Sequence, residues 1–260
     1  MNIESNRTVG QQAAAYPASK RVFEKLGIDY CCGGGTSLGE ACAEHGIAFG
    51  ELVKMLNSEE TRSVSAHTAD LDFPRMSLAA LSDHIVREHH VFTRDENERI
   101  TVLLGKVCSV HGDNHKELFA IQKIFGMMRL ELENHMLKEE RMLFPYIALM
   151  ESSLGFNQPV PPAPFGSTRN PIRVMLSEHD AAAEQLREIR QLSGDFNPPE
   201  DACTSYRSLY EALEGLEKDL HEHIHLENNL LFPKAIEMES GEPSNAVDVQ
   251  EKICSHQNSH

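Results

Sequence analysis

From residue 78 onward, apolar residues recur at intervals of three and four, without the strict alternation typical of a β-strand. This spacing places the apolar residues along one face of a helix, as in a helical bundle. Turn-forming residues interrupt the pattern at 111–114, in the proline-rich stretch 157–171 and at 194–199. The pattern therefore predicts four long helices, roughly at 78–109, 115–143, 171–192 and 202–231.

The first part of the chain differs, because glycine breaks it into short helical segments. One helical pattern runs from Pro17 to Leu26, and Ser37 with Glu40 forms a capping box that opens another helix. These features predict an all-α fold, an antiparallel four-helix bundle preceded by a small helical N-terminal domain. We place the N-terminal domain at 1–57, a linker at 58–77, the bundle at 78–239 and a disordered tail at 240–260.

The second and fourth predicted helices share the pattern His-x-x-x-Glu-x-x-x-Leu-Phe-Pro, whose two copies begin 88 residues apart, at His135 and His223. Residues four apart lie on the same face of a helix, so His135 pairs with Glu139 and His223 pairs with Glu227. Both pairs interrupt the apolar stripe of their helix. The proline that closes each copy predicts that the helix ends or kinks just beyond the pair.

Histidines also lie on the apolar stripes of the other two helices. His179 belongs to the stripe of the third helix. On the first helix one stripe contains His90, but an alternative stripe turns His89 inward, and the periodicity leaves this choice open. Because residues equidistant from a turn are level in antiparallel helices, these histidines and the two His-Glu pairs are expected in one buried layer.

Four imidazoles and two carboxylates in one buried layer are costly unless they are paired or bind metal. Imidazole with carboxylate suits Fe, Mn or Zn, and two carboxylates can bridge two ions. A ferritin-like site would be richer in glutamate, so this balance favours a metal site of the hemerythrin type.

Other titratable residues lie close to this layer in the sequence. Candidates for positions beside the ligands are His84, His89, Glu131 and Glu178. For the two glutamates, a solvated helix flank is the alternative interpretation. His225 lies two residues beyond His223, about 200° around the helix, and is expected to face solvent.

A second motif, Asp29-Tyr30-Cys31-Cys32-Gly33-Gly34, lies in the N-terminal segment. Adjacent cysteines form only a strained disulfide, so we expect two thiols on a glycine turn. The helix opened by Ser37 begins close by and could lower a thiol pKa, and thiolates here could hold or relay iron. The alternative is that both cysteines are small packing residues.

The composition of the chain indicates which classes of partner are excluded and which cellular compartment is expected. The chain has 24 Lys and Arg against 40 Asp and Glu, a net charge of −16 that repels nucleic acid. The N-terminus lacks an apolar signal segment and no apolar run approaches the length of a membrane span, so we expect no membrane association. These features predict a cytoplasmic protein whose six cysteines are reduced.

The motifs closely resemble those of the iron–sulfur cluster repair di-iron proteins, the repair of iron centres family of the ScdA/YtfE type. The resemblance extends to about residue 238 and departs at His225 and in the tail, which contains Cys254. It includes the Asp-Tyr-Cys-Cys-Gly-Gly segment, His-Ile-Val-x-x-His-His at 84–90, Ser-Glu-His-Asp at 177–180 and both Leu-Phe-Pro motifs.

The resemblance implies a non-haem di-iron site with oxo and carboxylate bridges. The implied ligands are His90, His135, Glu139, His179, His223 and Glu227, with both glutamates bridging, which selects His90 over His89. It also implies repair of iron–sulfur proteins damaged by nitrosative or oxidative stress, through an iron donor rather than a typical enzyme. The alternatives are binding of oxygen, reduction of nitric oxide, and redox sensing. A homodimer is compatible with the sequence.

Overall fold

The computed structural model describes residues 3–65 and 72–241. Within these ranges the regular elements are helices, apart from one isolated bridge between Thr8 and Ser37. The all-α prediction is therefore confirmed. The predicted tail beyond residue 241, with Cys254, lies outside the described residues, as do 66–71 of the predicted linker. None of the described helices combines the length and the apolar character needed to cross a membrane.

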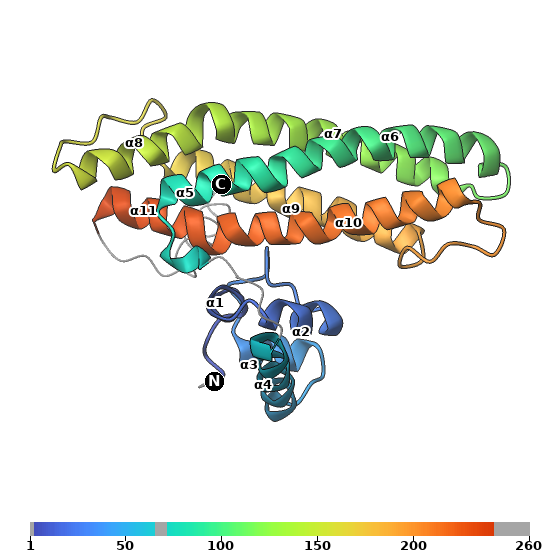
Figure 1. Ribbon diagram of the computed structural model, residues 1–260, viewed down its shortest axis with the longest axis horizontal. Coiled ribbons are helices and arrows are strands. Elements are labelled where there is room, and N and C mark those ends of the chain that lie inside the picture. The colour runs from blue at the N-terminus through green and yellow to red at the C-terminus, as the bar shows by residue number, and fades with distance from the viewer. Residues whose placement is uncertain (1–2, 66–71, 242–260) are drawn as a thin grey trace, which may run out of the picture. The chain divides into compact units, whose positions relative to one another are not determined.

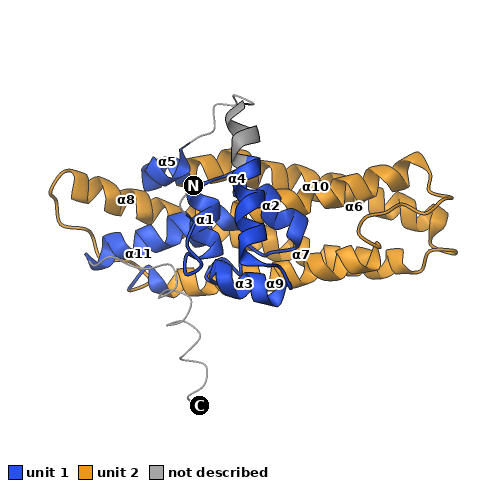
Figure 2. Ribbon diagram, turned by 90° about the horizontal axis from the view of Figure 1, so that it is seen from below, with its two compact units in different colours: residues 1–81, 167–169, 224–260 blue, residues 82–166, 170–223 orange. Residues whose placement is uncertain are grey.

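The chain forms two compact units, which Figure 2 shows in different colours. One unit contains residues 1–81, 167–169 and 224–260, and the other contains residues 82–166 and 170–223. The first unit thus joins the N-terminal helices with a segment from the far end of the chain. Its boundary at residue 223 falls inside a helix rather than in a loop.

Four N-terminal helices form the core of the first unit: α1 (Val9–Ala15), α2 (Ser19–Leu26), α3 (Leu38–Glu44) and α4 (Phe49–Ser65). The Ser37–Glu40 capping box is present at the start of α3, and a second one, Thr8 with Gln11, opens α1. Apolar side chains such as Phe23, Leu38 and Leu52 are buried together between these helices. α4 continues to Ser65, into the stretch predicted as linker, because Glu and Arg favour a helix even where apolar periodicity is weak.

The long helices of the bundle are interrupted by π-helical turns. α6, α7, α9 and the part of α10 up to His223 run side by side and enclose an apolar core (Figure 1). After the 3₁₀ turn η1 (Phe73–Arg75), the elements are α5 (Leu78–His84), η2 (Ile85–His90), α6 (Val91–His111), α7 (Glu117–Lys138), η3 (Glu139–Leu143), α8 (Phe144–Gly155), α9 (Arg169–Leu192), α10 (Thr204–Leu226), η4 (Glu227–Leu231) and α11 (Phe232–Ser240).

Two helical runs continue past the prolines that were predicted to end or kink them. Pro145 and Pro233 lie in the first turns of α8 and α11, directly after the π turns η3 and η4. In η3 the Phe144 N–H donates to the carbonyl of Glu139, five residues earlier, instead of four. This wider turn accommodates a residue that has no N–H and whose ring would clash in a regular α-helix. The runs end at Gly155 and Ser240, and each therefore extends about two to three turns beyond its predicted end.

Candidate metal centre

All six residues that the sequence nominated as ligands are buried, with at most 3% of each exposed. They lie on η2, α7, η3, α9, α10 and η4, and the two glutamates begin their π turns. π turns are frequent at functional sites because the extra residue shifts the face that the following side chains occupy. The residues are His90, His135, Glu139, His179, His223 and Glu227.

Glu139 stands between two sets of histidines. Its Oε2 lies 3.4 Å from His90 Nε2, and its Oε1 lies 3.3 Å from His135 Nε2. His223 is beside His90, with ring centroids 4.9 Å apart, and His179 is beside His135, with ring centroids 4.7 Å apart. The two oxygens of one buried carboxylate therefore face two different histidine pairs.

These side chains form two groups of potential metal ligands that share carboxylates. The ligand atoms of His90, Glu139 and His223 lie within 4.8 Å of one another, as do those of His135, Glu139 and His179. Glu227, four residues after His223 and the first residue of η4, is a possible ligand in both groups. Imidazole nitrogen with carboxylate oxygen is the donor set of Fe, Mn and Zn sites, so the residues fit a pair of such ions.

Two further glutamates hold the outer nitrogens of the candidate ligands. Glu178 Oε2 accepts a hydrogen bond from His135 Nδ1 at 2.8 Å, and Glu178 Oε1 accepts one from the Lys138 ammonium. Burial tends to raise the pKa of Glu178, but the hydrogen bonds and charges of His135 and Lys138 outweigh burial and lower this pKa to about 2. Glu178 therefore stays ionised and orients the ring of His135, as carboxylates do behind metal-bound histidines.

Glu140 has the same relation to His90, and the sequence reasoning missed it. Its Oε1 accepts hydrogen bonds from His90 Nδ1 at 2.7 Å and from Arg94 Nη2 at 2.6 Å. Burial opposes ionisation, but the hydrogen bonds from Arg94 and His90 lower the pKa of Glu140. The His90 and Glu140 positions are 50 residues apart, so helical periodicity within one segment carries no signal of this contact.

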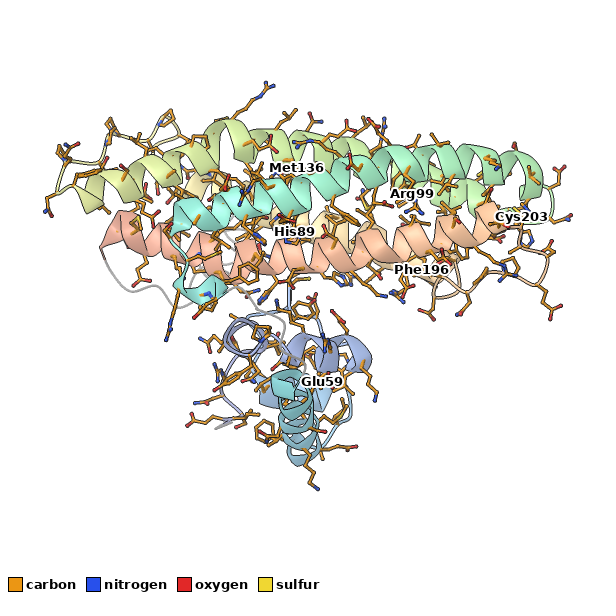
Figure 3. The ribbon with its side chains drawn as sticks, viewed as in Figure 1. Glu59, His89, Arg99, Met136, Phe196 and Cys203 are labelled. Carbon is orange, nitrogen blue, oxygen red and sulfur yellow. The ribbon has the colours of Figure 1, made fainter. Side chains whose placement is uncertain are left out.

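The remaining candidates lie farther from the carboxylates. His89, labelled in Figure 3, is directed from η2 toward α10, where its Nδ1–H donates to Asp219 Oδ1 at 2.9 Å. Its ring stacks on that of His223 with centroids 5.6 Å apart, and His84 packs edge-on against His89 at 5.7 Å. Glu131 instead accepts a hydrogen bond from Gln185 at the surface. The two histidines thus flank the layer, and Glu131 lies on the solvated helix flank.

The Cys31–Cys32 turn belongs to the first unit. The two sulfurs are 3.9 Å apart and form no disulfide, as expected for adjacent cysteines. The hydrogen bond with Cys32, together with burial, raises the pKa of Cys31 well above its ordinary value. The expectation that the neighbouring helix lowers a thiol pKa is therefore wrong for Cys31, because the Cys32 hydrogen bond, burial and the nearby Asp29 all raise this pKa.

Side chains of η4 hold this turn by its backbone. Asn229 Nδ2 donates to the carbonyl of Tyr30 at 3.1 Å and to that of Cys31 at 3.4 Å, and Asn228 Nδ2 donates to the same Cys31 carbonyl at 3.3 Å. His225 is fully buried, with its ring 5.5 Å from that of Tyr30, so the expectation that it faces solvent is wrong. The covering segment comes from the other end of the sequence, which periodicity along one helix does not reveal.

Close packing against Asn229 requires glycine in the turn. A Cβ at Gly34 would lie 2.5 Å from Asn229 Oδ1 and 2.9 Å from the carbonyl oxygen of Tyr30, which is backbone and cannot easily move. We expect Gly34→Ala to lower the free energy of unfolding by about 1–3 kcal/mol. The control is Gly50→Ala in α4, where a Cβ meets nothing within 4 Å. Urea unfolding of both variants tests this, and equal stabilities would show that the turn relaxes freely.

Comparison with known proteins agrees with this geometry. Residues 80–235 match the hemerythrin HHE cation binding domain, and residues 5–60 match ScdA_N, a domain of unknown function. The chain is 30% identical over 232 residues to a probable iron-sulfur cluster repair protein of Haemophilus influenzae, covering 89% of this chain and 97% of the relative. It is 33% identical over 231 residues to the iron-sulfur cluster repair protein YtfE of Escherichia coli and of Escherichia fergusonii, with the same coverage.

The predicted family resemblance is thereby confirmed along most of the chain. The hemerythrin match contains every candidate ligand, and the N-terminal match contains the Cys31–Cys32 turn. With both domains present in this order, the chain belongs to the family of iron–sulfur cluster repair proteins that are built on a hemerythrin domain.

Proposed function

We propose that this protein repairs damaged iron–sulfur clusters by supplying iron from a di-iron site in the bundle. The hemerythrin domain implies that the bound metal is non-haem iron. The observation that carries the di-iron proposal is Glu139, whose two oxygens face two different histidine pairs, at 3.4 Å from His90 and 3.3 Å from His135. The proposed repair function is supported by the relatives, which are named iron-sulfur cluster repair proteins.

In this proposal the six buried side chains hold two iron ions, with Glu139 and Glu227 bridging them. His90 and His223 bind one ion, and His135 and His179 bind the other. The bound iron supplies redox chemistry and is itself the cargo that a damaged cluster needs. Because the site contains no thiolate, it is expected to hold iron less tightly than a cysteine site would.

The residues behind the ligands fix their rings for this task. Glu140 accepts from His90 Nδ1 and Glu178 accepts from His135 Nδ1, which leaves Nε2 of both rings to face the carboxylate of Glu139. A histidine held in this way is a better metal ligand, because its orientation and tautomer are set before the metal binds. Both glutamates are only half-buried, so ions can be exchanged near them.

The direct test is repair of a purified iron–sulfur enzyme whose cluster nitric oxide has damaged. The iron-loaded protein should restore the enzyme, and the metal-free protein should not. Damaged iron–sulfur proteins are the proposed partners, so activity of that enzyme is the measurement. If the loaded protein consumes nitric oxide rapidly and restores no activity, the repair function is wrong and nitric oxide reduction takes its place.

The choice of His90 over His89 as a ligand has its own test. We expect His90→Ala to lower the iron content and the visible absorption of the loaded protein, because His90 Nε2 faces Glu139. His89→Ala should retain most of the iron, since its Nδ1 is engaged by Asp219. Iron loss in the His89 variant, with the His90 variant intact, would reverse the assignment.

A further inference from the structure

We infer that Asp29, Cys31 and Cys32 form a second metal site, which binds one divalent ion of the Fe(II) or Zn(II) class. The ligand atoms of these three residues lie within 4.8 Å of one another. None of them belongs to the bundle layer, and all three belong to the first compact unit. The site itself stands on this geometry, and the choice of iron as its natural ion rests on the proposed function.

The spacing of the two sulfurs fits a single ion. Cys31 Sγ and Cys32 Sγ are 3.9 Å apart. Two thiolates at about 2.3 Å from a tetrahedral ion are separated by about 3.8 Å, so little movement is needed. Two thiolates with one carboxylate form a softer donor set than the bundle layer, and this set favours Fe(II) and Zn(II) over Mg(II) or Ca(II).

Asp29 has one oxygen that organises the turn and another that remains for a metal. Its Oδ1 accepts hydrogen bonds from the backbone N–H groups of Cys31 at 2.9 Å and Cys32 at 3.0 Å, and from the Cys31 thiol at 3.1 Å. The same carboxylate therefore holds both cysteine backbones in place and lies beside the Cys31 sulfur, while these hydrogen bonds do not use Oδ2. Asp29 is exposed, and Cys32 is partly exposed, so an ion can reach the site from solvent.

The turn is also fixed from behind, so the three ligands are preorganised. Asn228 and Asn229 donate to the carbonyls of Tyr30 and Cys31. A Cβ at Gly33 would lie 2.9 Å from the carbonyl oxygen of Asp29, so glycine lets the chain close tightly here. Three protein ligands leave a fourth tetrahedral position open, which is typical of sites that accept an exogenous ligand rather than purely structural ones.

Cobalt(II) added to the full-length, metal-free, reduced protein without oxygen tests this site. Thiolate ligation of Co(II) produces a near-ultraviolet charge-transfer absorption that the histidines and carboxylates of the bundle do not produce. We expect this absorption in the intact protein and its loss in Cys31→Ser and Cys32→Ser. Cys203→Ser, at an exposed cysteine, should leave it unchanged.

Asp29→Asn distinguishes a ligand from a structural residue, because the amide oxygen can still accept the two backbone hydrogen bonds. We expect Co(II) to bind this variant at least about tenfold more weakly, since even residues behind metal ligands affect affinity by that much. Absence of the absorption in the intact protein, or unchanged affinity in Asp29→Asn, would overturn the inference. Unchanged iron content of the bundle would show that each variant is folded.

The same measurement separates this site from the proposed function. Glu139→Ala should lose bundle iron and keep the thiolate absorption, which would support two independent sites. Failure of repair by the iron-loaded protein, with the thiolate absorption intact, would contradict the repair function and leave the Asp29 site standing.

Discussion

Alanine in place of Glu139 is expected to cause the largest loss of metal of any single change. The two carboxylate oxygens of Glu139 face His90 and His135, so the substitution removes a ligand from both proposed ions at once. Loss of one ordinary supporting residue costs about 10- to 100-fold in metal affinity, and a shared ligand should cost at least as much. Metal analysis and the visible spectrum after anaerobic iron loading measure this loss.

Glu133→Ala is the matched control for Glu139→Ala. Glu133 is a glutamate on α7, partly exposed and 3.8 Å from Arg129, so its loss should leave iron content unchanged. A Glu139 variant that retains two irons per chain would show that the carboxylate is not a bridge. Equal losses in both variants would instead indicate a general destabilisation of the bundle.

The double change Cys31→Ser, Cys32→Ser should abolish most repair activity while the bundle keeps its iron and visible spectrum. The thiols are outside the layer of histidines and glutamates, and serine keeps nearly the same size at the buried Cys31. The measurement is the rate at which the iron-loaded variant restores an enzyme damaged by nitric oxide. Cys203→Ser should repair at the normal rate. Full activity of the double variant would show that the bundle supplies iron without the thiols.

The buried faces of the bundle helices were predictable because each His-x-x-x-Glu pair interrupts an apolar stripe of fixed period. Both pairs are buried, and neither glutamate has any exposed surface. That these residues bind iron remains a prediction. Helical periodicity did not decide which of His89 and His90 faces inward, and both are buried. The reason is that the π turn η2 changes the number of residues per turn there. A pattern of 3.6 residues per turn cannot assign a face across such a turn.

Contacts between segments that are distant in the sequence could not be predicted, because helical periodicity describes one segment at a time. Glu140, Asn228 and Asn229 lie inside the two His-x-x-x-Glu-x-x-x-Leu-Phe-Pro motifs, at positions to which the periodicity assigns no role, and their partners are 50 to 199 residues away. His225 was expected in solvent because only its own helix was considered. The periodicity of a single helix predicts which face packs against the bundle core. It does not predict whether another segment of the chain also buries the opposite face.

The attachment of the thiol turn to Asn228 and Asn229 bears on how this protein could be recombined with its relatives. A chimera that exchanges residues 1–57 alone would set a foreign turn against Asn229, whose side chain leaves no space for a Cβ at Gly10 or Gly34. Exchanging that segment together with residues 223–233 would carry both partners of the contact. The unit that must be exchanged together therefore consists of two stretches that are distant in the sequence. A chimera whose boundaries follow the domains of the linear sequence would separate these two stretches.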